Sequence, residues 1–291
     1  MNLQQHNISD NNFEQCIKCT ICTVYCPVAA VNPNYPGPKQ AGPDGERLRL
    51  KKFYDESLKY CINCKRCEVA CPSNVKIGDI IQAARIKYSK KQPKLRDYIL
   101  ANTDLVGTLS TPFAPIVNTT LGLKPVKAIL DGVMKIDHRR TFPKYAFGTF
   151  ESWYKKVAEK QAAYPSQVSY FHGCYVNYNN PQLGKDLIKV MNAFSIGVQL
   201  LEKEKCCGVA LISNGLIKQA QKQARTNINS IRKSVLEKKI PVIATSSTCT
   251  FTIRDEYPHL LDIDNADVRE DVELATRYIY RLLSQKKTKL N

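Results

Sequence analysis

A cysteine motif occurs twice near the start of the chain, each time with the same spacing and with a proline after the last cysteine. The two copies read Cys-Ile-Lys-Cys-Thr-Ile-Cys-Thr-Val-Tyr-Cys-Pro from Cys16 and Cys-Ile-Asn-Cys-Lys-Arg-Cys-Glu-Val-Ala-Cys-Pro from Cys61. Three thiolates at steps of three residues can converge on one four-iron, four-sulfur (4Fe-4S) cluster from a tight curl of backbone. The repeat therefore predicts two 4Fe-4S clusters.

The fourth cysteine of each motif precedes a proline, whose fixed φ and missing N–H direct the chain away. In two-cluster ferredoxins this fourth thiolate binds the other cluster. We therefore expect a crossed set of ligands: Cys16, Cys19, Cys22 and Cys71 for cluster 1, and Cys61, Cys64, Cys67 and Cys26 for cluster 2. Zinc is the alternative, but its structural sites favour two separated Cys-x2-Cys pairs or such a pair with histidines, and no histidine lies near either motif.

The remaining cysteines are spread over the second half of the chain: Cys174, Cys206, Cys207 and Cys249. Each lies just beyond an expected strand or in a strand–helix loop, where parallel sheets collect their ligands. Gly208 is expected to let the backbone approach a metal closely. The sequence predicts a further metal or cluster site here, with buried, unreactive thiols as the alternative. We interpret His172 as a loop histidine with satisfied hydrogen bonds.

The periodicity of apolar residues predicts an α+β fold. Residues 1–95 are expected to form a helical two-cluster domain of the α-helical ferredoxin type, with helices over 46–60 and 78–90. Residues 166–291 are expected to form an α/β domain around a parallel sheet. Its expected strands are 168–171, 198–201 and 241–245, and its expected helices are 182–194, 216–238 and 268–283.

Residues 96–165 are expected to connect the two domains. The stretch 98–123 carries a single charged residue, Asp104, and 138–156 mixes basic and aromatic residues. Such segments suit packing between domains, and they also suit docking on a membrane or on a partner protein. No run of about 18 apolar residues occurs, so we expect any membrane contact to be peripheral.

Charge and cysteine content narrow the class of protein. Residues 1–15 are polar and lack the basic start and apolar core of a signal peptide, so the twelve cysteines are expected to bind metal in a reducing compartment. The formal net charge of +17 suits acidic lipid headgroups, an acidic protein or nucleic acid. The sequence contains no nucleic-acid-binding motif, so we expect no nucleic-acid partner.

The motifs and their surroundings resemble a known family. The stretches that carry the resemblance are 35–50, 60–72, 171–178, 203–208 and 243–251. They are similar to the iron–sulfur subunits of membrane-linked dehydrogenases and heterodisulfide reductases, and among these to the C subunits of anaerobic glycerol-3-phosphate dehydrogenases. In that family the third cysteine set belongs to a cysteine-rich module called CCG.

The resemblance implies an electron-transfer protein that performs no substrate chemistry of its own. Its partners would be flavin-containing catalytic subunits A and B, which oxidise sn-glycerol 3-phosphate, and menaquinone as the acceptor in anaerobic respiration. It would lie as a peripheral protein and anchor on the cytoplasmic face of the inner membrane. Another oxidoreductase, such as a glycolate oxidase or a heterodisulfide-reductase-like complex, is the alternative. A different class of function is that the CCG module itself reduces a disulfide or binds quinone catalytically.

The chain departs from the family's pattern in two ways. Ser246 stands at the first position of the Cys-x2-Cys pair that usually ends the module, leaving Cys249 alone, and a serine oxygen is a poorer iron ligand than a thiolate. Relatives usually carry two CCG modules. This sequence shows the cysteines of one, so we expect the second module to be absent from this chain.

Overall fold

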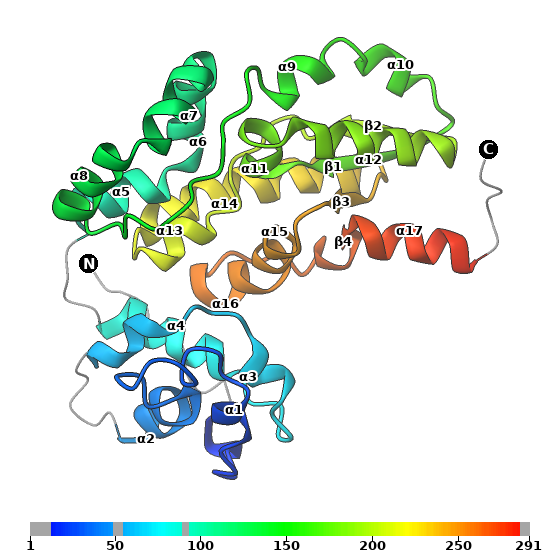
Figure 1. The fold of residues 1–291 in the computed structure, drawn as a ribbon. Helices are drawn as coiled ribbons and strands as arrows, with labels where there is room; N and C mark the ends of the chain where they lie inside the picture. The colour runs from blue at the N-terminus through cyan, green and yellow to red at the C-terminus, as the bar shows by residue number, and fades with distance from the viewer. Residues whose placement is uncertain (1–12, 49–54, 89–92, 286–291) are drawn as a thin grey trace. The chain divides into compact units, whose positions relative to one another are not determined.

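The computed structural model describes residues 13–48, 55–88 and 93–285, and their contacts divide the chain into two compact units, 1–92 and 93–291 (Figure 1). Unit 1 is built from short helices: η2 (Phe13–Gln15), α1 (Ile21–Val24), η3 (Gln40–Asp44), α2 (Gly45–Leu48), η4 (Glu56–Tyr60), α3 (Arg66–Val69) and α4 (Ile77–Tyr88). The helix expected at 78–90 is confirmed as α4. The one expected at 46–60 appears only as α2 and η4, and residues 49–54 lie outside the described part.

The two cysteine motifs have the same backbone path. In each, two non-glycine residues adopt positive φ at matching positions: Lys18 (60°) and Thr20 (65°) in the first, Asn63 (52°) and Lys65 (62°) in the second. This left-handed conformation costs ordinary residues roughly 1–2 kcal/mol each. The left-handed residues flank Cys19 and Cys64 and curl the backbone just before α1 and α3 begin.

The core of unit 1 forms between α4 and the cysteine loops. Ile80, Ile81 and Ala84 of α4 are buried together with Leu58 of η4, and three motif cysteines complete this cluster: Cys22, Cys26 and Cys67. The apolar core of the unit is therefore continuous with its thiols.

Unit 2 begins with helices and continues as a sheet covered on both faces. The helices before the sheet are α5 (Leu95–Ala101), α6 (Thr103–Ser110), η5 (Thr111–Phe113), α7 (Ala114–Gly122), α8 (Lys124–Met134), α9 (Phe150–Tyr154) and α10 (Ala158–Ala162). The remaining helices are α11 (Gly173–Tyr178), α12 (Pro181–Ala193), α13 (Val209–Ser213), α14 (Ile217–Arg232), η6 (Lys233–Glu237), α15 (Ser247–Phe251), η7 (Thr252–Glu256), α16 (Tyr257–Leu261), η8 (Arg269–Asp271) and α17 (Ala275–Ser284).

Four parallel strands form the sheet in the order β2-β1-β3-β4. They are β1 (Ser166–Phe171), β2 (Ile196–Leu200), β3 (Val242–Ala244) and β4 (Val272–Leu274). The chain leaves β1 toward β2 on one side and leaves β3 toward β4 on the other. The carboxyl ends of β1 and β3 therefore flank the point where the direction of winding reverses, which is the usual place for a site in such sheets.

Alternating residues of β1 face two different helix layers. Val168 and Tyr170 join a core with Phe150 of α9 and the apolar side of α12. Ser169 points to the other face, where its hydroxyl lies 2.6 Å from that of Ser234 in η6. The sheet is thus covered by α9, α11, α12 and α17 on one face and by α14–η6 on the other, as expected for an α/β layer.

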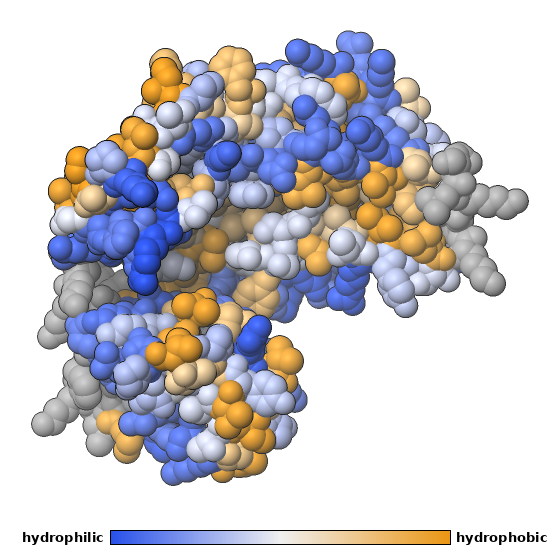
Figure 2. All heavy atoms as spheres, viewed as in Figure 1, coloured by the Kyte–Doolittle hydropathy of each residue, from blue (hydrophilic) through white to orange (hydrophobic). Residues whose placement is uncertain are grey.

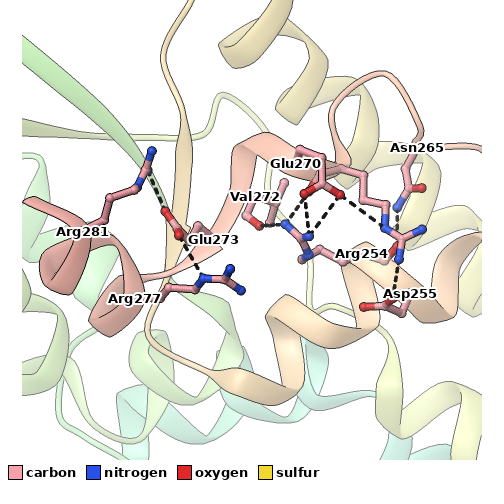
Figure 3. Close-up of polar contacts among 9 residues, drawn as sticks. Arg254, Asp255, Asn265, Glu270, Val272, Glu273, Arg277 and Arg281 are labelled. Atoms are coloured by element: carbon pink, nitrogen blue, oxygen red, sulfur yellow. Dashed lines mark hydrogen bonds and ion pairs between the residues drawn. The ribbon is translucent and has the colours of Figure 1, made fainter. Parts of the chain in front are cut away.

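The C-terminal part differs from the expectation of one helix over 268–283. That prediction was wrong at its start, because Val272 is fully buried beside Val242 in the edge strand β4, and the helix α17 begins only at Ala275. Arg254 holds this turn by donating to the carbonyls of Arg269 (2.8 Å) and Val272 (2.7 Å), with Glu270 beside its guanidinium (Figure 3). Three residues are too few for their alternation to be recognised in sequence.

In the part of the chain that the structure describes, none of the helices has both the length and the apolar character needed to cross a bilayer.

Candidate metal centres

Two pockets in unit 1 are each lined by four motif cysteines. One is lined by Cys61, Cys64 and Cys67 of the second motif together with Cys26 of the first. The other is lined by Cys16, Cys19 and Cys22 of the first motif together with Cys71 of the second. The structure therefore brings together the two crossed sets expected from the sequence, each with one cysteine from the other repeat.

The fourth cysteine of each motif is held by a backbone amide beyond the proline. The N–H of Ala29 donates to Sγ of Cys26 and that of Val75 donates to Sγ of Cys71, both at 3.4 Å. Such bonds stabilise negative charge on sulfur and help to set the potential of a cluster. The side-chain amide of Gln82 reaches Sγ of Cys61 at 3.9 Å, and no equivalent bond to Cys16 occurs among the described residues.

The chemistry of these pockets fits a 4Fe-4S cluster. Burial raises the pKa of the Cys67 thiol to about 12, and neighbouring Glu68 and Cys61 add to the shift. The hydroxyl of Tyr35 is buried beside Cys61 and has no partner with hydrogen-bond geometry in the described residues. A bound cluster would supply positive iron for the thiolates and an acceptor for this hydroxyl. No group of three or more His, Cys, Asp or Glu in the described ranges surrounds a single point as ligands of one metal ion would.

The second motif contains an ion-paired lysine that the first motif lacks. The ammonium of Lys65 pairs with Glu68 (3.1 Å) and with Asp79 of α4. All three side chains are largely buried, and the matching position in the first motif is Thr20. The two pockets are therefore electrostatically different, although their cysteine spacing is identical.

The third set of cysteines gathers at the carboxyl edge of the sheet of unit 2. Cys174 follows β1, Cys206 and Cys207 follow β2, and Cys249 follows β3. The thiols are close enough to shift one another's pKa values in the order Cys174, Cys206, Cys207, Cys249. Cys206, Cys207 and Cys249 are buried and Cys174 is partly exposed.

These shifts divide the four thiols into two kinds. Bonds from Cys174 and Cys207 lower the pKa of Cys206, and a bond from Cys207 lowers the pKa of Cys249. Cys174 and Cys207 are the donors of these bonds, and donating raises their own pKa values. A low pKa favours the thiolate, which is the form that binds metal or acts as a nucleophile.

Ser246 has a structural role in place of the missing cysteine. It is the N-cap of α15, and its hydroxyl accepts the N–H of Cys249 at 3.2 Å. Gly208 precedes α13 at φ +90°, and a Cβ there would meet its nearest neighbour at 3.7 Å. The left-handed conformation alone favours glycine at this position, and the close approach of the backbone to a metal stays a prediction.

His172 is buried between two carboxylates, which agrees with its interpretation as a satisfied loop histidine. Burial lowers its pKa, but Glu204 and Glu151 outweigh this and raise the pKa to about 9. Glu204 also accepts the N–H of Gly173 at 2.7 Å, which fixes the turn that carries Cys174. A pocket lined by residues of α6, α11 and α14 opens here onto Cys174 and Cys206.

Asp104 belongs to this site but was not identified from the sequence. Its carboxylate accepts the N–H of Cys206 at 2.8 Å, across 102 positions of the chain. One sequence feature could have identified Asp104: it is the single charged residue in the stretch 98–123. Burial raises the pKa of Asp104, and the bond from Cys206 opposes the shift.

Family comparisons agree with these two sets of sites. Residues 12–75 match the 4Fe-4S dicluster domain and residues 168–254 match the cysteine-rich CCG domain. Together with the thiol-lined pockets, these matches define the class: an iron–sulfur protein of electron transfer that combines a dicluster domain with a CCG domain.

Similar curated proteins place the chain within that class. The C subunit of the anaerobic glycerol-3-phosphate dehydrogenase of Escherichia coli K12 is 66% identical over 97% of this chain and 72% of its own length. The chain belongs to the family of these C subunits. The D subunit of the dihydromethanophenazine:CoB–CoM heterodisulfide reductase of Methanosarcina barkeri is 23% identical over 85% of the chain and 58% of its own length. No solved structure gives a significant match.

Proposed function

We propose that this chain relays electrons from a flavin-containing catalytic pair, which oxidises sn-glycerol 3-phosphate, to menaquinone at the inner face of the membrane. The observation that carries the proposal is the pair of pockets in unit 1, each lined by four cysteines drawn from both motifs. The family relationship supplies the dehydrogenase context, because the E. coli relative is named as the C subunit of that enzyme.

Within this proposal each pocket holds one 4Fe-4S cluster. Cys16, Cys19, Cys22 and Cys71 would bind cluster 1, and Cys61, Cys64, Cys67 and Cys26 would bind cluster 2. A 4Fe-4S cluster accepts and releases one electron at a time, which suits a relay between a two-electron flavin and a quinone. The protein's part is to exclude water, to hold the thiolates and to adjust potential through the amides of Ala29 and Val75.

The CCG set in unit 2 is proposed as a further metal or cluster site. Cys174, Cys206, Cys207 and Cys249 lie within hydrogen-bonding reach of one another in sequence order, at the sheet edge where ligands collect. The depressed pKa values of Cys206 and Cys249 favour metal binding there.

The test of the relay uses the complete complex under anaerobic conditions. The chain is assembled with subunits A and B, and sn-glycerol 3-phosphate oxidation is coupled either to menaquinone in vesicles or to a dye that accepts electrons directly from flavin. Changing Cys19 and Cys64 to Ala should abolish quinone reduction and leave dye reduction intact. Continued quinone reduction by this variant would refute the relay. Iron, sulfide and EPR measurements on wild type should give about eight irons for unit 1, with any excess assigned to the CCG set.

A second candidate is catalysis at the CCG thiols themselves, which the pocket beside Cys174 and Cys206 favours. It requires the isolated chain to reduce a disulfide or a quinone from an artificial electron donor. Cys206→Ala would abolish that activity while the EPR signals of the two clusters in unit 1 remain. Absence of activity in the isolated wild-type chain would rule this candidate out.

A further inference from the structure

An apolar stripe runs along the outer side of the helices that precede the sheet in unit 2. Leu105 and Leu109 of α6, Phe113 of η5 and Ile116 of α7 recur at helical spacing, and each is 60–68% exposed. Figure 2 shows apolar side chains over α7 and α8 on this side of the unit. Large apolar side chains grouped this way mark a binding surface more often than they mark chance exposure.

Helix α8 adds an exposed face of mixed apolar and basic character. Ile129 and Val133 are 63% and 78% exposed, while Val126, Leu130 and Met134 are turned partly inward. At 100° per residue, Lys124 and Lys135 lie along one edge of that outer face and Ile129 and Val133 along the other. A helix of this kind lies flat in a lipid interface, with apolar side chains in the acyl layer and lysines at the phosphates.

The positive charges around this surface are available to a partner, whereas the negative charges near it are already engaged. Lys124, Lys127, Lys135, Arg140 and Lys144 form no ion pair within the described residues. The nearby acids are already engaged: Asp131 with His138, Asp137 with Arg139, and Asp104 with the N–H of Cys206. The surface therefore complements an anionic partner.

The surface is held firmly on the unit rather than on a loose loop. A Cβ at Gly107 would lie 2.4 Å from the ring of Tyr178, so α6 packs directly on α11. Asn118 of α7 exchanges two 2.8 Å hydrogen bonds with the backbone of Tyr145. The stripe on α6 and α7 therefore lies on helices whose other sides pack on the rest of the unit.

We propose that α6–α8 form the surface by which this chain docks on an anionic lipid bilayer. The occupant is a lipid surface rather than a protein, because apolar side chains beside cations that form no ion pair match acyl chains beside phosphate headgroups. This inference rests on the proposed function and deepens it by assigning the membrane contact to particular residues. Leu105 and Thr108 also line the pocket at Cys174 and Cys206, so docking brings that pocket to the bilayer.

The test is sedimentation of the cluster-loaded full chain with vesicles of phosphatidylcholine alone or of equal parts phosphatidylcholine and phosphatidylglycerol. Wild type should bind the anionic vesicles and bind the neutral ones far less. Changing Lys124, Lys127 and Lys135 to Gln should weaken binding about a hundredfold, because each lysine near an anionic surface contributes several-fold. Leu109→Ser with Phe113→Ser should weaken it about tenfold or more.

Matched controls lie elsewhere on unit 2. Tyr280→Ser removes a 71% exposed aromatic from α17, and changing Lys160, Lys218 and Lys238 to Gln removes three exposed cations. Both controls should bind like wild type, and circular dichroism melting should show that every variant is folded. Equal binding by the α6–α8 variants and the controls would overturn the proposal. The proposal would also be overturned if the Leu109/Phe113 variant still bound anionic vesicles like wild type but no longer co-purified with subunits A and B.

Failure of the docking surface can be told apart from failure of the relay. The Cys19/Cys64 variant should lose electron transfer but still sediment with anionic vesicles. The α6–α8 variants should keep the EPR signals of unit 1 and the reduction of a water-soluble quinone, and lose only the vesicle-bound activity. Vesicle binding by wild type without any quinone reduction would refute the relay and leave the surface standing.

Discussion

The carboxylate of Asp104 in α6 accepts the backbone N–H of Cys206 at 2.8 Å. This bond joins the helical segment in front of the sheet to the loop that carries the adjacent cysteine pair. Cys206 is buried, so its N–H has no water as a ready alternative acceptor. The position of the Cys206–Cys207 loop therefore depends on a residue of α6.

Asp104→Ala should lower the free energy of unfolding of unit 2 by about 1–3 kcal/mol, since it leaves a buried N–H without an acceptor. Asp104→Asn keeps an oxygen at this position and should recover most of the loss. Urea unfolding under anaerobic conditions measures both values. A second readout is the rate at which Cys206 reacts with a thiol reagent, which should rise in the Ala variant and stay near wild type in the Asn variant.

Two helical glycines, one in α6 and one in α8, should respond in opposite ways to the same change. Gly107→Ala places a methyl group 2.4 Å from the ring of Tyr178 and should cost about 1–3 kcal/mol of stability through overpacking. Gly132→Ala in α8 meets nothing within 4 Å and should stabilise by about 0.5–1 kcal/mol, because alanine loses less backbone entropy in a helix. Thermal melts of the two variants beside wild type test the pair, and equal shifts would show that α6 does not pack on Tyr178 as described.

The crossed ligand sets can be tested in a chain that is limited to one cluster. Changing Cys61, Cys64 and Cys67 to Ala removes the second motif's own three thiols and should leave about four irons in unit 1. In that background Cys71→Ala should remove the remaining cluster and Cys26→Ala should not. The reverse result, read by EPR and iron analysis, would mean that each motif binds its cluster with its own four cysteines.

Lys65 should matter far more than an exposed lysine in an ion pair of similar length. Lys65→Met leaves Glu68 and Asp79 buried without their cation, which should cost about 3–5 kcal/mol of stability in the cluster-loaded chain. Lys59→Met removes an exposed pair with Glu56 and should leave stability unchanged. Chemical unfolding monitored by the cluster's visible absorbance compares the two variants. Similar midpoints would show that the Lys65 pairs contribute little.

Most of the architecture could be predicted because its signals are local. The spacing of the cysteines indicated the curl that the backbone of both motifs adopts, and apolar periodicity indicated β1, α12, β2 and α14 close to their observed bounds. The edge strand β4 could not be predicted in this way. Its three residues are strand because Val272 pairs with Val242 across a distant part of the chain, and a pairing of this kind leaves no periodic trace.

In the candidate sites, too, features set by nearby residues could be predicted, and features set by contacts between distant residues could not. Ligand types and spacing were readable from sequence, whereas the positive φ of Lys18 and Lys65 was not, since glycine is the residue that normally marks that conformation. Ser246 was interpreted as a lost ligand, and its N-cap bond to Cys249 became visible only in three dimensions. Asp104 was noticed as an isolated charge, but its partner lies on another element.

The exchange of Cys26 and Cys71 between the two pockets has a consequence for assembly and repair. If each pocket binds a cluster as proposed, neither cluster can gain its fourth thiolate until both repeats have been synthesised and have closed on one another. Damage follows the same rule: oxidation that strips one cofactor frees a stretch of backbone on which the other depends. A chain that holds one cluster should therefore bind it less firmly than a chain that holds both, because each pocket keeps one thiolate on the backbone of the other motif.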